Sequence, residues 1–236
     1  MRKPPRKVHA QEGGWLVVSA WPAELARLEA ALPTLPSRVQ RQIRLASVGV
    51  GLVEAAMNTA RLLAQHRPAC VLLVGTAGVY PGRRPDLPLG GAALIDKIVL
   101  LPEILPGKHA YLPDLVPRRE RSTSNLRKVI WQATRLPSAD VACPLAITAS
   151  ARAAATGAKL SGCALENLEA FAVARAATTA GVPFAAILGI ANHVGPGGHR
   201  EWQKHAKIAA AAACAAALAL LSTGSLRSPL HGTSRG

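Results

Sequence analysis

The sequence predicts an α/β protein, because short apolar stretches typical of strands alternate with longer stretches that have the apolar spacing of helices. Its 236 residues suffice for one domain with a sizeable core. Half of the residues are hydrophobic but only 3% are aromatic, so alanine, valine, leucine and isoleucine must build that core. The predicted strands are Trp15–Ser19, Ile43–Val48, Cys70–Gly75, Ala92–Leu101, Ala139–Thr148, Gly162–Leu165 and Pro183–Ile190. The predicted helices are Pro22–Leu32, Leu52–Gln65, Ser122–Arg135, Glu166–Ala180 and Arg200–Leu221.

Prolines and glycines separate the first elements of the chain. Residues 1–14 are basic and contain no apolar stretch, so we expect a disordered arm rather than a secretory signal. Pro22 suits the first turn of a helix, and Pro33 ends that helix. Gly49-Val50-Gly51 is predicted to turn the chain into the second helix. Gly75-Thr76-Ala77-Gly78 is predicted to form a tight turn after the third strand.

The second half of the chain contains two irregular segments and one long apolar run. Residues 102–121 hold many prolines and charges, which indicates a long irregular excursion of the kind that is often functional. The longest apolar run, Ile208–Leu221, has 14 residues, which is too short for a typical membrane span. We expect it to belong to a helix that closes the domain. Residues 222–236 are polar, and we expect a disordered tail there.

The formal charge of the chain is +15, from 28 basic and 13 acidic residues. Such a charge is compatible with nucleic-acid binding, but the basic residues collect at the ends and in loops, and aromatic side chains for stacking on bases are nearly absent. We therefore expect no nucleic-acid partner. The cysteines are not paired at metal-ligand spacing and form no disulfide-rich pattern, which fits a cytoplasmic protein without a metal. They are Cys70, Cys143, Cys163 and Cys214.

Polar side chains follow the ends of several predicted strands, where ligands gather in open α/β sheets. Glu24 follows the first strand, where it either acts as a general base or only complements a helix dipole. Glu169 lies at a strand-to-helix junction, where a carboxylate can accept two hydrogen bonds from a vicinal diol. Glu166 suits a simple helix-terminal charge better than Glu169 does. Asn192 and His193 follow the last strand, and such a histidine is more often an ordinary loop residue.

Five segments in the same order resemble the nucleoside phosphorylase/nucleosidase superfamily. Each is degenerate, but five in register are fairly specific. The resemblance implies a three-layer α/β fold with a central mixed sheet, in which residues 15–221 form one catalytic domain. The segments are Ser19-Ala20-Trp21-Pro22-Ala23-Glu24, Ser47-Val48-Gly49-Val50-Gly51, Val74-Gly75-Thr76-Ala77-Gly78, Glu166-Asn167-Leu168-Glu169-Ala170 and Gly189-Ile190-Ala191-Asn192-His193-Val194-Gly195.

The resemblance also implies roles for single residues. Family nucleosidases carry a glutamate after the first strand that activates water, and Glu24 falls on that position. Family phosphorylases carry a phosphate-binding arginine two positions before the first glycine of the third segment's GTAG-like turn, where this chain has Leu73. Glu169 is implied to bind the ribose 2′- and 3′-hydroxyls, and Asn192 to orient the departing base. The other implied substrate-binding residues are Gly51, Thr76, Ala77, Gly78, Leu168 and His193.

The residue at position 192 separates two kinds of nucleosidase in the superfamily. Those for methylthioadenosine and S-adenosylhomocysteine carry an aspartate there, which helps to protonate the purine. Ala191-Asn192-His193-Val194-Gly195, followed by a basic loop and Trp202, is instead similar to futalosine hydrolases. Leu168 replaces the methionine usual before the diol-binding glutamate, and the family's base-stacking phenylalanine has no counterpart at residues 148–152.

These features predict an N-glycosidase that hydrolyses a purine nucleoside, futalosine or a relative, and thereby serves menaquinone biosynthesis. We expect it to be cytoplasmic and homo-oligomeric, to need no metal or organic cofactor, and to bind neither nucleic acid nor membrane. Two alternatives remain open. One is another enzyme of the superfamily, either a methylthioadenosine-type nucleosidase or a purine nucleoside phosphorylase, and the other is a nucleoside-binding relative without activity.

Overall fold

The structure, a computed structural model, describes residues 13–102 and 112–223. The strands are β1 (Trp15–Ser19), β2 (Ile43–Ser47), β3 (Cys70–Val79), β4 (Ala92–Leu100), β5 (Arg119–Arg121), β6 (Ser138–Cys143), β7 (Leu165–Glu166) and β8 (Phe184–His193). The helices are α1 (Ala26–Ala31), α2 (Ser37–Gln40), α3 (Leu52–His66), α4 (Ser124–Thr134), α5 (Ala151–Ser161), α6 (Ala170–Thr179) and α7 (Gly198–Ser222). Two short 3-10 helices, η1 (Pro22–Glu24) and η2 (Leu32–Thr34), flank α1.

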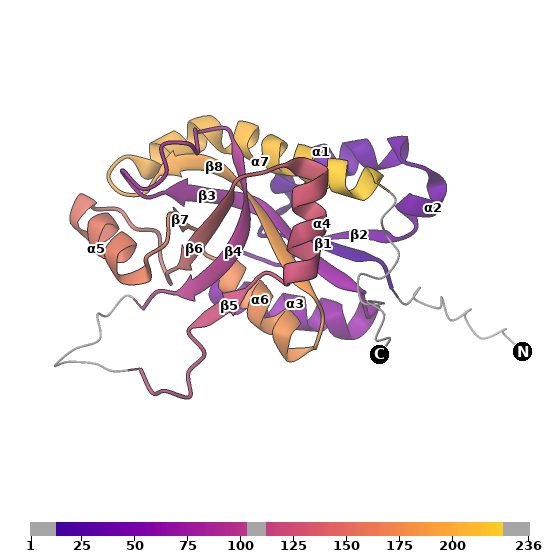
Figure 1. Cartoon of the computed structure of the whole chain (residues 1–236), viewed down its shortest axis with the longest axis horizontal. Helices are drawn as coiled ribbons and strands as arrows, with labels where there is room; N and C mark the ends of the chain where they lie inside the picture. Colours follow the sequence, from indigo (N-terminus) through magenta and orange to yellow (C-terminus); the bar gives the residue numbers. More distant parts are fainter. Residues whose placement is uncertain (1–12, 103–111, 224–236) are drawn as a thin grey trace, which may run out of the picture.

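The strands of the described residues form one eight-stranded mixed sheet with helices on both faces (Figure 1). Seven strands lie in the order β2-β1-β3-β7-β6-β4-β5, and β8 pairs with both β3 and β4. β1 runs parallel to β2 and β3, and β3 runs parallel to β8, whereas β7 is antiparallel to β3. The predicted three-layer α/β fold with a central mixed sheet is confirmed.

Two apolar cores lie on opposite faces of the sheet. On one face the sheet packs against α3 and α6, through residues such as Leu62 and Val173. On the other face it packs against α1, α4 and α7, through residues such as Ile130 and Leu220. A third, small cluster surrounds Tyr80 beneath α5. The helices therefore cover both faces and leave the carboxyl ends of the parallel strands for a site.

The predicted turn at Gly75–Gly78 is wrong. β3 continues through these residues to Val79, because β8 runs parallel to it along its whole length and pairs with its last residues. The predicted strand over Ala139–Thr148 is too long, and β6 ends at Cys143 because Pro144 has no N–H for the ladder.

The helix predicted over Glu166–Ala180 begins later, at Ala170. Glu166 belongs to β7, which pairs with both β3 and β6, so a helix-terminal charge is the wrong interpretation of this residue. The helix predicted from Pro22 is divided into η1, α1 and η2, and Glu24 ends η1. The excursion predicted over residues 102–121 returns to the sheet as β5.

Helix α5 was not predicted, although its buried residues recur at helical spacing, because all of them are small: Ala154, Gly157, Ala158 and Ser161. Ser150 caps its N-terminus by accepting a hydrogen bond from the N–H of Ala153 at 3.2 Å. Most of the predicted disordered arm and tail lies outside the described residues. Gly13 and Gly14, at the end of the arm, are described and hydrogen-bond to the segment before β3, and Ser222 still belongs to α7.

Helix α7 is long and apolar enough to span a membrane by length and composition alone. It packs along β8 and β3, which agrees with the predicted closing helix (Figure 1). Its alanines allow a close approach to the sheet. At Gly189 of β8, a Cβ atom would stand 2.0 Å from the carbonyl oxygen of Ala209 in α7.

We expect Gly189→Ala to destabilise the protein by about 1–3 kcal/mol or more, because the added methyl group must push the helix backbone away from the sheet. The free energy of unfolding from urea titration measures this effect. Stability equal to that of the wild type would contradict the close packing of α7 on β8.

Candidate active site

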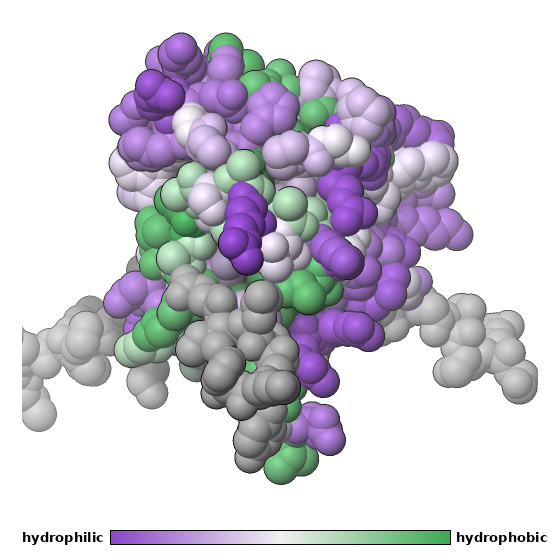
Figure 2. All heavy atoms as spheres, turned by 90° about the vertical axis from the view of Figure 1, so that its left-hand side faces the viewer, coloured by the Kyte–Doolittle hydropathy of each residue, from purple (hydrophilic) through white to green (hydrophobic). Residues whose placement is uncertain are grey.

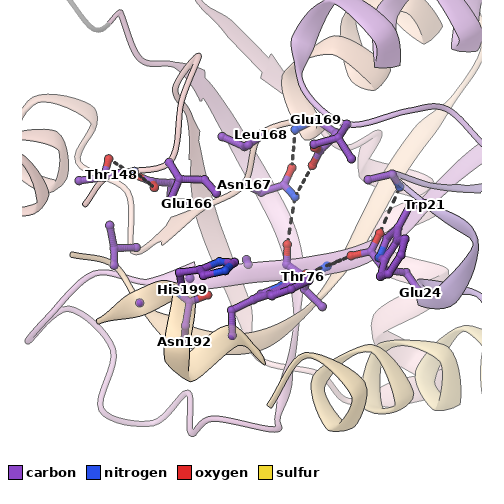
Figure 3. A pocket seen from close by; sticks show the side chains of 18 residues that line it. Trp21, Glu24, Thr76, Thr148, Glu166, Asn167, Leu168, Glu169, Asn192 and His199 are labelled. Atoms are coloured by element: carbon purple, nitrogen blue, oxygen red, sulfur yellow. Dashed lines mark hydrogen bonds between the residues drawn. The ribbon is translucent and has the colours of Figure 1, made fainter. Parts of the chain in front are cut away.

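A cavity of about 380 Å³ opens at the carboxyl ends of β1, β3, β6 and β8 (Figure 3). Carboxylates, amides, threonine hydroxyls and a histidine form its polar lining, together with apolar side chains. Figure 2 looks at the end of the molecule where α5 lies and shows hydrophilic residues over much of that surface, with smaller hydrophobic areas between them. The lining residues used below are Trp21, Glu24, Thr76, Gly78, Thr148, Glu166, Asn167, Leu168, Glu169, Asn192, His199 and Trp202.

Glu24 is held at one side of this cavity by three hydrogen bonds. Its Oε1 atom accepts from the backbone N–H and the hydroxyl of Thr76, each at 3.0 Å. Its Oε2 atom accepts from the N–H of Ala20 at 3.2 Å. A Cβ atom at Gly75 would only come into van der Waals contact with the carboxylate, 3.4 Å from Oε1. The orientation of Glu24 is thus set by the ends of β1 and β3.

Only 7% of the Glu24 surface is exposed, and this burial raises the pKa of its carboxyl group to about 7. The hydrogen bonds from Thr76 lower this pKa, and the negative charge of Glu169 raises it. A carboxyl group with a pKa near neutrality can take up and release a proton at the pH of a cell. Glu24 therefore has the burial and the basicity of an acid–base residue.

Glu169 lies across the cavity, where a backbone N–H and a side-chain amide hold its carboxylate (Figure 3). Its Oε1 atom accepts from the N–H of Gly51, and its Oε2 atom accepts from the amide of Asn167, each at 2.9 Å. The same amide donates to the carbonyl oxygen of Thr76 at 3.0 Å and so fixes β7 to β3. Burial raises the pKa of Glu169 against the lowering effect of these hydrogen bonds. With one hydrogen bond to each oxygen, the carboxylate retains further acceptor capacity, and Glu169 lines the cavity.

Asn192 reaches the cavity because of a bulge in β8. Ala77 pairs with Ile190, but the next residue, Gly78, pairs with Asn192, so Ala191 is an extra residue in the strand. A bulge of this kind turns the following side chain to the other face of a sheet. The Asn192 amide donates to the carbonyl oxygen of His193 at 2.8 Å, which leaves one amide hydrogen and the amide oxygen for a ligand.

The structure does not bring His193 into this cavity. Its side chain is exposed, and its ring contacts the Glu201 carboxylate at 3.0 Å. Of the other residues expected to bind the substrate, Thr76, Ala77, Gly78 and Leu168 line the cavity, and Gly51 donates its N–H to Glu169.

The aromatic rings that line the cavity do not come from residues 148–152, where the resemblance places the family's base-stacking phenylalanine. Trp21 follows β1, and His199 and Trp202 lie in the first turns of α7. The rings of His199 and Trp202 stack with their centroids 5.9 Å apart, and the Trp202 indole N–H lies 3.4 Å from the Thr76 hydroxyl. Flat apolar surface for a planar ligand is therefore present.

Sequence reasoning placed neither Asn167 nor Glu166 among the residues that line the cavity. Asn167 accepts hydrogen bonds from the N–H groups of Glu169 and Ala170, an Asx-type turn that starts α6. An asparagine two residues before a predicted site carboxylate was the available signal. Glu166 carried no such signal, because its place in β7 follows from strand pairing.

No lysine or arginine lines the cavity in the described parts of the chain. Leu73, which stands at the position of the family phosphorylases' arginine, is buried in the core between the sheet and helices α3 and α6. Three carboxylates line the cavity instead, from Glu24, Glu166 and Glu169. Such a lining favours neutral ligands over phosphate.

The similarity to known structures is one of fold. A 5′-methylthioadenosine/S-adenosylhomocysteine nucleosidase from Neisseria meningitidis, in complex with methylthio-immucillin-A, superimposes with a TM-score of 0.78 at 18% identity and covers 89% of this chain and 99% of its own. Futalosine hydrolase of Helicobacter pylori gives a TM-score of 0.80 at 11% identity, with coverages of 90% and 98%. A methylthioadenosine/S-adenosylhomocysteine nucleosidase from Colwellia psychrerythraea, in complex with adenine, gives 0.78 at 15% identity, with coverages of 92% and 96%.

The sequence itself shows the family. No protein with a curated description matches it. Residues 17–222, however, match the family model of the phosphorylase superfamily. This match spans most of the chain, including the whole cavity described above, and the chain belongs to the phosphorylase superfamily.

Proposed function

We propose that the protein hydrolyses the N-glycosidic bond of a purine nucleoside, with water as the nucleophile and Glu24 as the general base. The observation that carries this proposal is the buried Glu24 carboxylate, with a pKa near 7, in a cavity whose described lining has no lysine or arginine. Phosphate would meet three carboxylates there without a positive partner, whereas water needs only a base. Hydrolysis is therefore favoured over phosphorolysis.

Glu24 and Glu169 have different roles at the sugar of the substrate. Glu24 takes a proton from water as the water attacks the anomeric carbon, and the transition state has oxocarbenium character. Glu169 accepts hydrogen bonds from the 2′- and 3′-hydroxyls with its two remaining acceptor positions. Gly51 and Asn167 hold that carboxylate in place, so its position does not depend on the ligand.

The base is proposed to lie beside Asn192, which lines the cavity. An asparagine amide hydrogen-bonds to a departing base but cannot give it a carboxylic proton. Hypoxanthine accepts negative charge on O6 and needs less acid assistance than adenine does. Asn192 therefore favours a hypoxanthine nucleoside such as futalosine over methylthioadenosine. A role in menaquinone synthesis, a cytoplasmic location and a homo-oligomeric state belong to the same proposal.

A panel of purine nucleosides tests the function directly. The purified protein is incubated with inosine, adenosine, methylthioadenosine and futalosine, with and without phosphate, and the released base and sugar are identified. We expect free ribose products at rates that do not depend on phosphate. Formation of a sugar 1-phosphate would show that the reaction is phosphorolysis and not hydrolysis. Tight binding without release of a base would indicate an inactive relative.

Asn192→Asp is expected to shift the preference toward adenine nucleosides, because the aspartate can protonate N7 of the leaving base. The ratio of kcat/KM for inosine to that for adenosine measures the shift. His193→Ala is the matched control, since the neighbouring side chain lies outside the cavity and its loss should leave this ratio unchanged. A wild-type preference for adenosine that His193→Ala does not alter would rule out the futalosine assignment.

A further inference from the structure

Helix α7 contacts Glu24 and its surroundings at two points. Trp202, near the start of the helix, donates its indole N–H to the Thr76 hydroxyl at 3.4 Å. Cys214, roughly three turns further along the same helix, donates its thiol to the backbone carbonyl oxygen of Glu24 at 3.0 Å. Cys214 is buried, and burial raises the pKa of its thiol, so the thiol remains a donor. The two contacts fix α7 relative to Glu24.

Trp202, Thr76 and Glu24 form a chain of hydrogen bonds that runs in one direction. An indole N–H can only donate, so the Thr76 hydroxyl oxygen must accept at that point. The hydroxyl has one hydrogen, and its oxygen lies 3.0 Å from the Oε1 atom of Glu24 (Figure 3). The backbone carbonyl oxygen of Thr76 accepts from the Asn167 amide at 3.0 Å, which holds the residue in place. The hydroxyl hydrogen is therefore directed at Glu24.

The same chain determines which oxygen of Glu24 is available to water. A carboxylate has about four acceptor positions, two on each oxygen. The Oε1 atom accepts from both the N–H and the hydroxyl of Thr76, which fills its two positions. The Oε2 atom accepts only from the N–H of Ala20, at 3.2 Å. One position therefore remains, and it is on Oε2.

We propose that Trp202 is a positioning residue for the general base: its indole N–H directs the Thr76 hydroxyl toward Glu24, which keeps that carboxylate ionised and leaves its Oε2 atom for water. The inference rests on the proposed function, since it concerns the general base of the same reaction. Without the indole N–H, the Thr76 hydroxyl can rotate about its C–O bond, and its hydrogen bond to the carboxylate weakens. Hydrogen bonds to charged groups are among the stronger ones in proteins, so this loss is measurable.

The expected effect on ionisation has a definite sign. The hydrogen bond from the Thr76 side chain lowers the pKa of Glu24, against the larger raising effect of burial. A weaker bond raises this pKa further, so less of the ionised base is present at acidic pH. Glu169, whose charge raises the same pKa, and Cys214, at the backbone, also face Glu24. The variants below leave both of these groups unchanged.

A role in packing is the alternative, because the Trp202 ring also lines the cavity and stacks on His199. Loss of ring contacts with the substrate would lower kcat/KM by the same factor at every pH. A raised pKa of Glu24 would instead lower kcat/KM only at acidic pH, because the carboxyl group is fully ionised well above its pKa. The pH profile therefore separates the two roles.

The test measures kcat/KM of Trp202→Phe between about pH 5 and pH 8, since this variant keeps an aromatic ring and removes the N–H. We expect the midpoint of the fall at acidic pH to rise by roughly half a pH unit, which lowers kcat/KM about threefold on the acidic side. Thr76→Val should raise the midpoint by about one unit, and adding Trp202→Phe to it should raise the midpoint no further. Trp21→Phe is the matched control, because it makes the same change at another tryptophan of the cavity, which donates to none of the described residues. Its midpoint should equal that of the wild type.

The pKa of Glu24 can also be measured without turnover. In isotope-labelled protein, the carboxyl carbon of Glu24 is titrated by NMR, and Glu24→Gln identifies its signal. The same pKa in the wild type and Trp202→Phe would overturn the inference and leave Trp202 a packing residue. An equal shift in Trp21→Phe would overturn it too, because the effect would then not depend on the contact with Thr76.

The two readouts distinguish this inference from the proposed function. A pKa that shifts in Trp202→Phe, in a protein that hydrolyses no nucleoside, would keep the hydrogen-bond chain and defeat the proposed hydrolase function. Hydrolysis by the wild type together with an unshifted pKa in Trp202→Phe would do the reverse.

Discussion

Glu24→Gln is expected to lower kcat by about 10²–10⁴-fold with little change in substrate affinity, because the substitution keeps the shape of the side chain and removes its basicity. Hydrolysis of the best substrate from the nucleoside panel is the measurement. Glu29→Gln is the matched control, since it makes the same chemical change at an exposed position of the following helix. Near-normal turnover of Glu24→Gln would remove Glu24 from the mechanism.

The pH dependence of the wild type should report the same group. A general base acts only when it is deprotonated, and the pKa of Glu24 is about 7. kcat/KM should therefore fall about tenfold for each pH unit below 7 and level off above it. The kcat/KM of Glu24→Gln should not show this fall below pH 7. A wild-type profile that stays flat down to pH 5 would contradict the raised pKa.

Glu169→Gln is the second change with a large expected effect. The carboxylate is assigned two hydroxyl contacts, and an amide presents a donor to Gly51, Asn167 or the ribose in place of an acceptor. We expect kcat/KM to fall by roughly 100-fold or more, the scale of two charge-assisted hydrogen bonds. The loss should be greater in kcat if these bonds strengthen in the transition state.

Substrates that lack a hydroxyl separate ribose binding from damage to the fold. A 2′-deoxynucleoside should react poorly with the wild type and lose little further activity with Glu169→Gln. Glu54→Gln, on the exposed side of α3, is the matched control and should behave as the wild type. If the wild type and Glu169→Gln respond equally to the missing hydroxyl, Glu169 does not bind the diol.

Most of the strands and helices, but not β5 or α5, could be predicted from the sequence because apolar periodicity and proline positions are local properties. The same reasoning placed Glu24, Glu169 and Asn192 at the ends of strands, and parallel strands bring such ends to one edge of a sheet. The packing of α7 on the domain was expected from its apolar run, Ile208–Leu221. These features need no knowledge of which strand lies beside which.

The remaining features depend on pairing between distant segments, and only the tertiary structure decided them. Gly75 and the residues after it form a strand rather than a turn because β8 lies beside them. Glu166 is a strand residue in the cavity because β3 and β6 both pair with its two-residue strand, which is too short to have a pattern of its own. The bulge at Ala191 turns Asn192 toward the cavity and leaves His193 outside it. A bulge could not be predicted from the sequence, because an extra residue is defined only relative to the partner strand with which it fails to pair.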